Sequence, residues 1–136
     1  RLAKSKTSIV AELYGSPFKD LTPDQTTRRY QELRFDAQPQ YVYGRARLSH
    51  TREIAAEFEV KLNLDGQGTG WNLLPSEQIG IGGYDTVRGY EERALNTDSG
   101  VLASIEVLTP KFPLITVKKQ NQKQEIFQIL GFLDYG

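Results

Sequence analysis

Residues 54–64 have the sequence IAAEFEVKLNL, in which apolar residues occupy every second position. These positions are Ile54, Ala56, Phe58, Val60, Leu62 and Leu64. A repeat of two residues places all of them on one face of a β-strand, whereas a helix would distribute them around its circumference. Glu57, Glu59 and Lys61 then point to the opposite face. We therefore predict a strand over residues 54–64 with one apolar face and one charged face.

Toward the N-terminus, weaker alternation predicts two more strands, over residues 7–14 and 34–48. Gly44 is expected to introduce a bulge or bend into the second of them. The polar residues 49–53 are predicted to form a short connection to the next strand. Residues 18–33 are polar and contain Pro23, which favours a long loop, with a short helix over residues 24–33 as the alternative.

Toward the C-terminus, the glycine-rich residues 65–72 predict a turn or a fraying strand end. Residues 100–109 (GVLASIEVLT) predict a strand that Pro110 ends. Residues 117–124 predict a solvated connection. Residues 125–136 are apolar at most positions, which predicts a strand with contacts on both faces.

The composition excludes several classes of protein. Seventeen basic and seventeen acidic residues balance, and no basic block suggests a nucleic-acid partner. The chain has no cysteine, and its Asp, Glu and His residues lack the spacing of a metal site, so neither a metal nor a cofactor is predicted. The single histidine, His50, has no nucleophile–base–orienter set around it and is expected to be solvated.

The chain starts with Arg1 and lacks Met, so we expect an interior piece of a longer protein.

A glycine-rich stretch follows the predicted turn: residues 73–93 have the sequence LLPSEQIGIGGYDTVRGYEER. Glycine permits φ > 0, so four glycines within ten residues predict a loop of special conformation. A dinucleotide-binding motif is rejected, because Asp85 occupies the position of its third glycine and no apolar strand precedes it.

This stretch, and above all its VRGY tetrad at residues 87–90, resembles the signature of the ShlB/FhaC/HecB family of two-partner-secretion transporters. The similarity continues through residues 98–100 and 105–110 and ends with GFLDYG at residues 131–136. The resemblance implies an all-β fold, in which antiparallel strands form a segment of a transmembrane outer-membrane β-barrel. Residues 1–136 would supply about five strands of this partial barrel domain, with long loops near residues 15–33 and 68–99. The family's POTRA modules and its remaining strands would lie outside this chain.

The resemblance also implies a set of functional residues on the glycine-rich loop and on the barrel wall. The motif residues are Val87, Arg88, Gly89 and Tyr90, their wall anchor is Asp134, and the supporting residues are Gly82, Gly83 and Tyr84. Arg88 is expected to enter the barrel interior and pair with Asp134, because a planar guanidinium can form bidentate hydrogen bonds. Tyr84 and Tyr90 are expected to contact the last strand.

The function implied is export of a secreted partner protein, of the haemolysin or adhesin type, across the outer membrane of a Gram-negative type envelope. The chain would be no enzyme, and its partners would be the secreted protein, outer-membrane lipid and its own periplasmic POTRA domains. Phe58, Val60 and Leu62 would face lipid. One alternative is a BamA-like outer-membrane assembly factor. Another is a soluble β-sandwich binding module, because period-two alternation is the same in both architectures.

Overall fold

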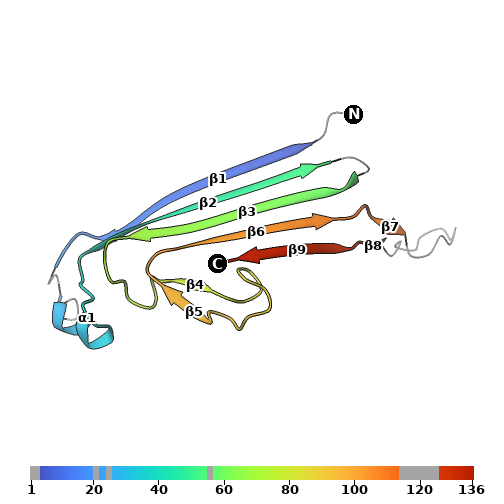
Figure 1. Cartoon of the computed structure of the whole chain (residues 1–136). Coiled ribbons are helices and arrows are strands. Elements are labelled where there is room, and N and C mark those ends of the chain that lie inside the picture. The colour runs from blue at the N-terminus through green and yellow to red at the C-terminus, as the bar shows by residue number, and fades with distance from the viewer. Residues whose placement is uncertain (1–3, 20–21, 24–25, 55–56, 114–125) are drawn as a thin grey trace, which may run out of the picture.

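The computed structural model describes residues 4–19, 22–23, 26–54, 57–113 and 126–136. Long antiparallel strands form one five-stranded sheet in the order β1-β2-β3-β6-β9 (Figure 1). These strands are β1 (Ser5–Ser16), β2 (Tyr41–Glu53), β3 (Glu59–Thr69), β6 (Gly100–Leu108) and β9 (Leu130–Tyr135). Two short hairpins pair β4 (Ile79–Ile81) with β5 (Leu95–Thr97) and β7 (Phe112–Pro113) with β8 (Ile126–Phe127). The prediction of an all-β, antiparallel fold is confirmed.

Within the described residues there is one helix, α1 (Thr27–Leu33), in the connection between β1 and β2. Thr26 caps it, since its hydroxyl accepts a hydrogen bond from the backbone N–H of Arg29. A long loop was favoured for residues 18–33, so the alternative of a short helix is the one that the structure bears out. No described helix has the length and apolarity needed to cross a bilayer.

The strand register gives the sheet one polar and one apolar face. Ser49, Asn63, Ser104 and Asp134 stand opposite one another on successive strands, so they lie in one row on one face. The same face carries Arg45, Arg47, Lys61, Asp65, Gln67 and Glu106. The other face carries Ile9, Leu13, Leu48, Leu62, Leu64, Ala103, Ile105, Val107 and Leu133.

The buried residues of the sheet lie on its polar side, at the end where the long loops emerge. Tyr43, Gln67 and Leu102 are buried there on the sheet itself, and Leu73 and Ile79 are buried in the loop between β3 and β6. The apolar face is the exposed one: Ile9 is 74% exposed, Leu13 79% and Leu133 71%. Among the described residues, no second layer covers that face.

The strand predicted over residues 54–64 begins and ends later in the sequence than predicted. β3 begins at Glu59, and the turn between β2 and β3 closes with a hydrogen bond from the Ile54 N–H to the Phe58 carbonyl. Glu57 in this turn has φ = 63°. Ile54 and Phe58 continue the alternation through the turn, so the apolar pattern does not reveal where the strand starts. The assignment of Val60, Leu62 and Leu64 to one apolar face is correct.

Other predicted boundaries also need correction. Residues 49–53 are part of β2, so His50 lies in a strand, where its Nδ1 is 2.8 Å from the Thr7 hydroxyl. Residues 65–69 extend β3, because residues 65–67 pair with both β2 and β6 and residues 68–69 pair with β2. Residues 34–40 precede β2 and are not a strand, and pairing runs through Gly44 without a bulge.

The C-terminal strand is shorter than predicted. Residues 126–127 pair as β8 with β7, and β9 starts only at Leu130. β9 is the edge strand of the sheet and pairs on one side with β6. The predicted connection over residues 117–124 lies outside the described residues.

Candidate functional site

The loop between β3 and β6, residues 70–99, folds back along the sheet (Figure 1). Its two limbs pair as β4 and β5, and residues 82–94 between these short strands form the tip of the loop. Hydrogen bonds from the tip reach residues on the polar face of the sheet, namely Ser104, Glu106 and Asp134. The loop therefore lies over the polar face.

Arg88 at the tip binds Asp134 on β9. The Arg88 Nε and Nη2 atoms donate hydrogen bonds of 2.7 Å each to the two carboxylate oxygens of Asp134, which is the bidentate geometry of guanidinium and carboxylate. The Arg88 backbone N–H also donates to Asp134 Oδ2, at 3.0 Å. The side chain of Asp134 is only 3% exposed and that of Arg88 14%. We call this group, with the contacts described next, the tip anchor.

Three further residues of the sheet complete the tip anchor. Arg88 Nη1 donates to Glu106 Oε1 at 2.6 Å, and Nη2 donates to the Ser104 hydroxyl at 3.0 Å. The guanidinium carbon lies 3.8 Å from the centroid of the Phe132 ring, in a cation–π arrangement. The hydrogen bonds to Asp134, followed by the one to Glu106, raise the pKa of Arg88, so the cation is stabilised in this position.

The conformation of the tip depends on Gly82, which has φ = 104°. The carbonyl of Gly82 accepts a hydrogen bond from the Arg93 N–H at 3.1 Å, and this bond closes the tip. A Cβ atom at position 82 would collide with the Glu91 carbonyl oxygen. Glycine is therefore required here both by backbone conformation and by space.

We expect Gly82→Ala to destabilise the closed tip by about 1–3 kcal/mol, because it combines strained φ with a backbone collision. The measurement is hydrogen exchange at residues 82–94 in the intact protein. Gly89→Ala is a matched variant: φ is 96°, but nothing lies within 4 Å of the added Cβ, so its effect should be smaller. Gly68→Ala, also with open space, should have no effect on the tip. Equal exchange in all three variants would contradict this account.

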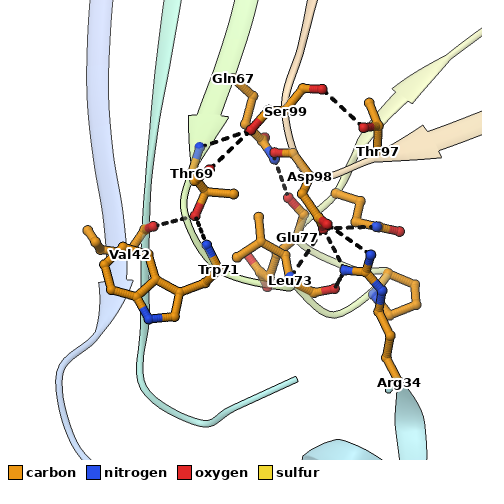
Figure 2. A network of polar contacts seen from close by, with 12 residues as sticks. Arg34, Val42, Gln67, Thr69, Trp71, Leu73, Glu77, Thr97, Asp98 and Ser99 are labelled. Atoms are coloured by element: carbon orange, nitrogen blue, oxygen red, sulfur yellow. Dashed lines mark hydrogen bonds and ion pairs between the residues drawn. The ribbon is translucent and has the colours of Figure 1, made fainter. Parts of the chain in front are cut away.

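A second ion pair joins the root of the long loop to the segment that follows α1. Arg34 Nη2 donates to Asp98 Oδ2 at 2.8 Å, and Arg34 Nη1 donates both to Asp98 Oδ1 and to the Leu73 carbonyl, at 2.5 Å each. Asp98 also accepts hydrogen bonds from the Leu73 N–H and from Gln78 Nε2. The hydrogen bond from Arg34, supported by that from Gln78, lowers the pKa of Asp98. We call this group the root anchor (Figure 2).

The root of the loop is also bound to the sheet through Gln67 on β3 (Figure 2). Gln67 is 5% exposed, and its Nε2 donates to the backbone carbonyls of Glu77 and Asp98 at 3.0 Å each. Its Oε1 accepts a hydrogen bond from Arg45 Nε at 2.6 Å. Both limbs of the loop are therefore attached to the sheet by one buried amide.

The structure brings some of the predicted site residues together and leaves others apart. Arg88 and Asp134 are in contact, and the Val87 side chain lies against Gly136, where an added Cβ would come within 2.8 Å of it. Tyr84 and Tyr90 are 82% and 69% exposed, so the expected packing of these rings against the last strand is not present. Gly83, with φ = 108°, lies next to the Glu92 carboxylate, and Gly89 completes the turn after Arg88.

The sequence did not predict the root anchor, nor the partners of Arg88 other than Asp134. Arg34 and Asp98 are 64 positions apart, and no local pattern connects them. Ser104 and Glu106 alternate with apolar residues, so their shared face was detectable, but their proximity to Arg88 was not. In the part of the chain that the structure describes, no group of three or more His, Cys, Asp or Glu side chains could bind a metal.

Comparison with known proteins gives a family match over most of the chain. Residues 16–136 match the family described as haemolysin secretion/activation protein ShlB/FhaC/HecB. The heme/hemopexin transporter protein HuxB of Haemophilus influenzae is 31% identical over 85 residues, which cover 61% of this chain and 15% of HuxB. The chain thus matches only a small part of that relative's length. No solved structure matches the chain significantly.

Proposed function

This chain belongs to the ShlB/FhaC/HecB family of haemolysin secretion/activation proteins, and on that premise we propose that it forms part of the wall of an outer-membrane transporter. The family consists of transporters rather than enzymes. The transporter to which these residues belong exports a secreted partner protein of the haemolysin or adhesin type. Periplasmic POTRA domains and the other strands of the barrel complete it outside residues 1–136.

The observation that carries this proposal is the distribution of polarity over the sheet. A water-soluble sheet buries its apolar face and exposes its polar one. Here Ile9, Leu13 and Leu133 are more than 70% exposed on the apolar face, while the buried residues of the sheet, Tyr43, Gln67 and Leu102, lie on the polar face. This arrangement suits a barrel wall, whose apolar face contacts lipid and whose polar face lines the interior.

The position of the long loop supports the same proposal. A loop that leaves the strands at one end and folds back over the polar face would lie within the barrel interior. The polar face near the tip presents both signs of charge, with Arg47 and Lys61 beside Asp65 and Glu106. Such a surface can remain hydrated beside an exported chain and offers it no continuous apolar patch on which to adhere.

Two observations argue against the alternatives, a soluble β-sandwich and a BamA-like assembly factor. A soluble β-sandwich needs a second sheet packed on the apolar face, and the described residues provide none. A BamA-like assembly factor would have the same wall, but residues 16–136 match the transporter family.

The experiment that tests the proposal uses the full-length protein purified from outer membranes and reconstituted into planar lipid bilayers in KCl. We expect ion conductance, together with secretion of the co-expressed partner protein in cells. Recovery of the full-length protein as a soluble periplasmic species without conductance would overturn the proposal of a membrane β-barrel. Conductance without any effect of deleting the gene on secretion would overturn the transport function while leaving the barrel in place.

A further inference from the structure

The root anchor joins two loops that leave the same end of the sheet. Arg34 belongs to the connection between β1 and β2, directly after α1, whereas Leu73 and Asp98 belong to the loop between β3 and β6. Leu73 lies before β4 and Asp98 directly after β5. One guanidinium therefore holds the entering and the leaving limb of the long loop at once (Figure 2).

The contact between Arg34 and Asp98 depends on directed hydrogen bonds as well as on the attraction of opposite charges. The Arg34 side chain is 30% exposed and that of Asp98 23%, so water does not fully screen the pair. Asp98 accepts hydrogen bonds from a guanidinium, an amide and a backbone N–H, which belong to three different residues. The carboxylate therefore fixes the spacing of the two limbs, and a lysine at position 34 could not make all of the bonds of Arg34.

The β4–β5 hairpin connects the root of the loop to its tip, so the spacing of the limbs at the root affects the position of the tip. β4 begins directly after Gln78, which donates to Asp98, and β5 ends one residue before Asp98, so the hairpin starts at the anchored root. Gln67 fastens the carbonyls of Glu77 and Asp98 to β3, which sets the position of the root on the wall. Because Arg34 and Gln67 both hold the base of the hairpin, the direction in which the hairpin extends is restricted.

We propose that Arg34 is a positioning residue of the transporter: through Asp98 and Leu73 it orients the long loop so that Arg88 meets Asp134. The connection between β1 and β2 thereby takes part in placing a tip that it does not itself contact. This inference rests on the proposed function for its effect on export, but its effect on the position of the tip stands on geometry alone.

The test compares hydrogen exchange in three variants of the full-length protein in lipid or detergent. Asp98→Asn keeps the size of the side chain but replaces one acceptor oxygen by a donor facing Arg34 or Leu73. We expect exchange to become about tenfold faster or more at root residues 73–79 and also at tip residues 82–94, while β3 and β6 keep their protection. Arg34→Lys, which retains the charge, should give an intermediate effect. Arg28→Ala, which removes an exposed ion pair with Glu32 on the same connection, should change neither region.

Two results would overturn the proposal. If Asp98→Asn releases the root but leaves exchange at the tip unchanged, the root anchor does not position Arg88. If all strands lose protection together, Asp98 serves only global stability. Export of the partner protein is measured in parallel, and we expect it to fall in the order wild type, Arg34→Lys, Asp98→Asn. Faster exchange at the tip in a protein that exports nothing even as wild type would support the anchor and refute the proposed function.

Discussion

Replacing Arg88 by alanine is expected to reduce export of the partner protein by about tenfold or more. Arg88 makes five hydrogen bonds to the wall, of which three go to Asp134 and one each to Glu106 and Ser104. Truncation removes four of them and leaves the carboxylates of Asp134 and Glu106 without their shared cation. Breaking a buried pair costs about 3–5 kcal/mol, and a water-filled interior reduces that cost. A loss of 1.4 kcal/mol already corresponds to about a factor of ten in the anchored population.

The structure also ranks the variants of the tip anchor. Arg88 carries one positive charge between two carboxylates, so its loss leaves two unneutralised negative charges on the wall. Asp134→Ala leaves Arg88 paired with Glu106 and should be milder. Arg88→Lys keeps the charge but cannot bind Asp134 through two atoms while reaching Ser104 and Glu106, so it should recover only part of the export. The double variant Arg88→Ala with Asp134→Ala should be little worse than Arg88→Ala alone, because both remove the same contact.

Export is measured as partner protein in the medium, normalised to the amount of transporter in the outer membrane. Arg47→Ala is the matched control, because it removes an arginine from the polar face that Arg88 contacts. Arg47 pairs with Asp65 in an exposed position, where 60% of the Arg47 side chain is accessible. Such a pair contributes about 0–1 kcal/mol. Export at the wild-type level in Arg88→Ala, or an equal loss in Arg47→Ala, would contradict the role of the tip anchor.

The faces of the strands could be predicted from the sequence, but their ends could not. Alternation has a period of two in any strand, so Val60, Leu62 and Leu64 were assigned to the correct face without knowledge of their neighbours. The turn before β3 contains neither glycine nor asparagine at its positive-φ position, which Glu57 occupies. Residues 65–69 contain Asp and two glycines, which favour turns locally, but pairing of the whole segment with β2, and of residues 65–67 also with β6, outweighs that preference.

The contacts of the site depend on the register between strands, which a single sequence does not specify. Asp134 could be assigned to the wall through the family resemblance, whereas Glu106 and Phe132 become neighbours of Arg88 only when β6 pairs with β9 in the observed register. The root anchor depends on two loops that emerge at one end of the sheet. Arg34 stands at the start of the strand predicted over residues 34–48, and Asp98 belongs to the resemblance at residues 98–100, but neither pattern indicates that the two side chains pair.

The second large effect is expected on the apolar face of β3. Leu64 is the central residue of this strand and stands between Leu48 and Ala103 on the same face. If the face contacts lipid, Leu64→Arg places a charge near the middle of the bilayer and should destabilise the assembled barrel by about 2–4 kcal/mol. Val60 is the second residue of β3, next to the turn, so Val60→Arg should cost only about 0–1 kcal/mol near the membrane surface.

The neighbouring residue provides the control that separates lipid contact from a general intolerance of this strand to arginine. Asn63 lies one position before Leu64 at almost the same depth, but on the polar face, where it accepts a hydrogen bond from Ser49. Asn63→Arg should therefore leave assembly nearly unchanged. The measurement is the free energy of unfolding of the full-length protein in lipid vesicles, together with its level in the outer membrane. If the apolar face were instead buried in the core of a soluble protein, Val60→Arg should cost as much stability as Leu64→Arg, because that cost would not depend on depth in a membrane. The predicted order of cost, Leu64→Arg well above Val60→Arg and Val60→Arg no less than Asn63→Arg, is specific to a sheet that crosses a bilayer.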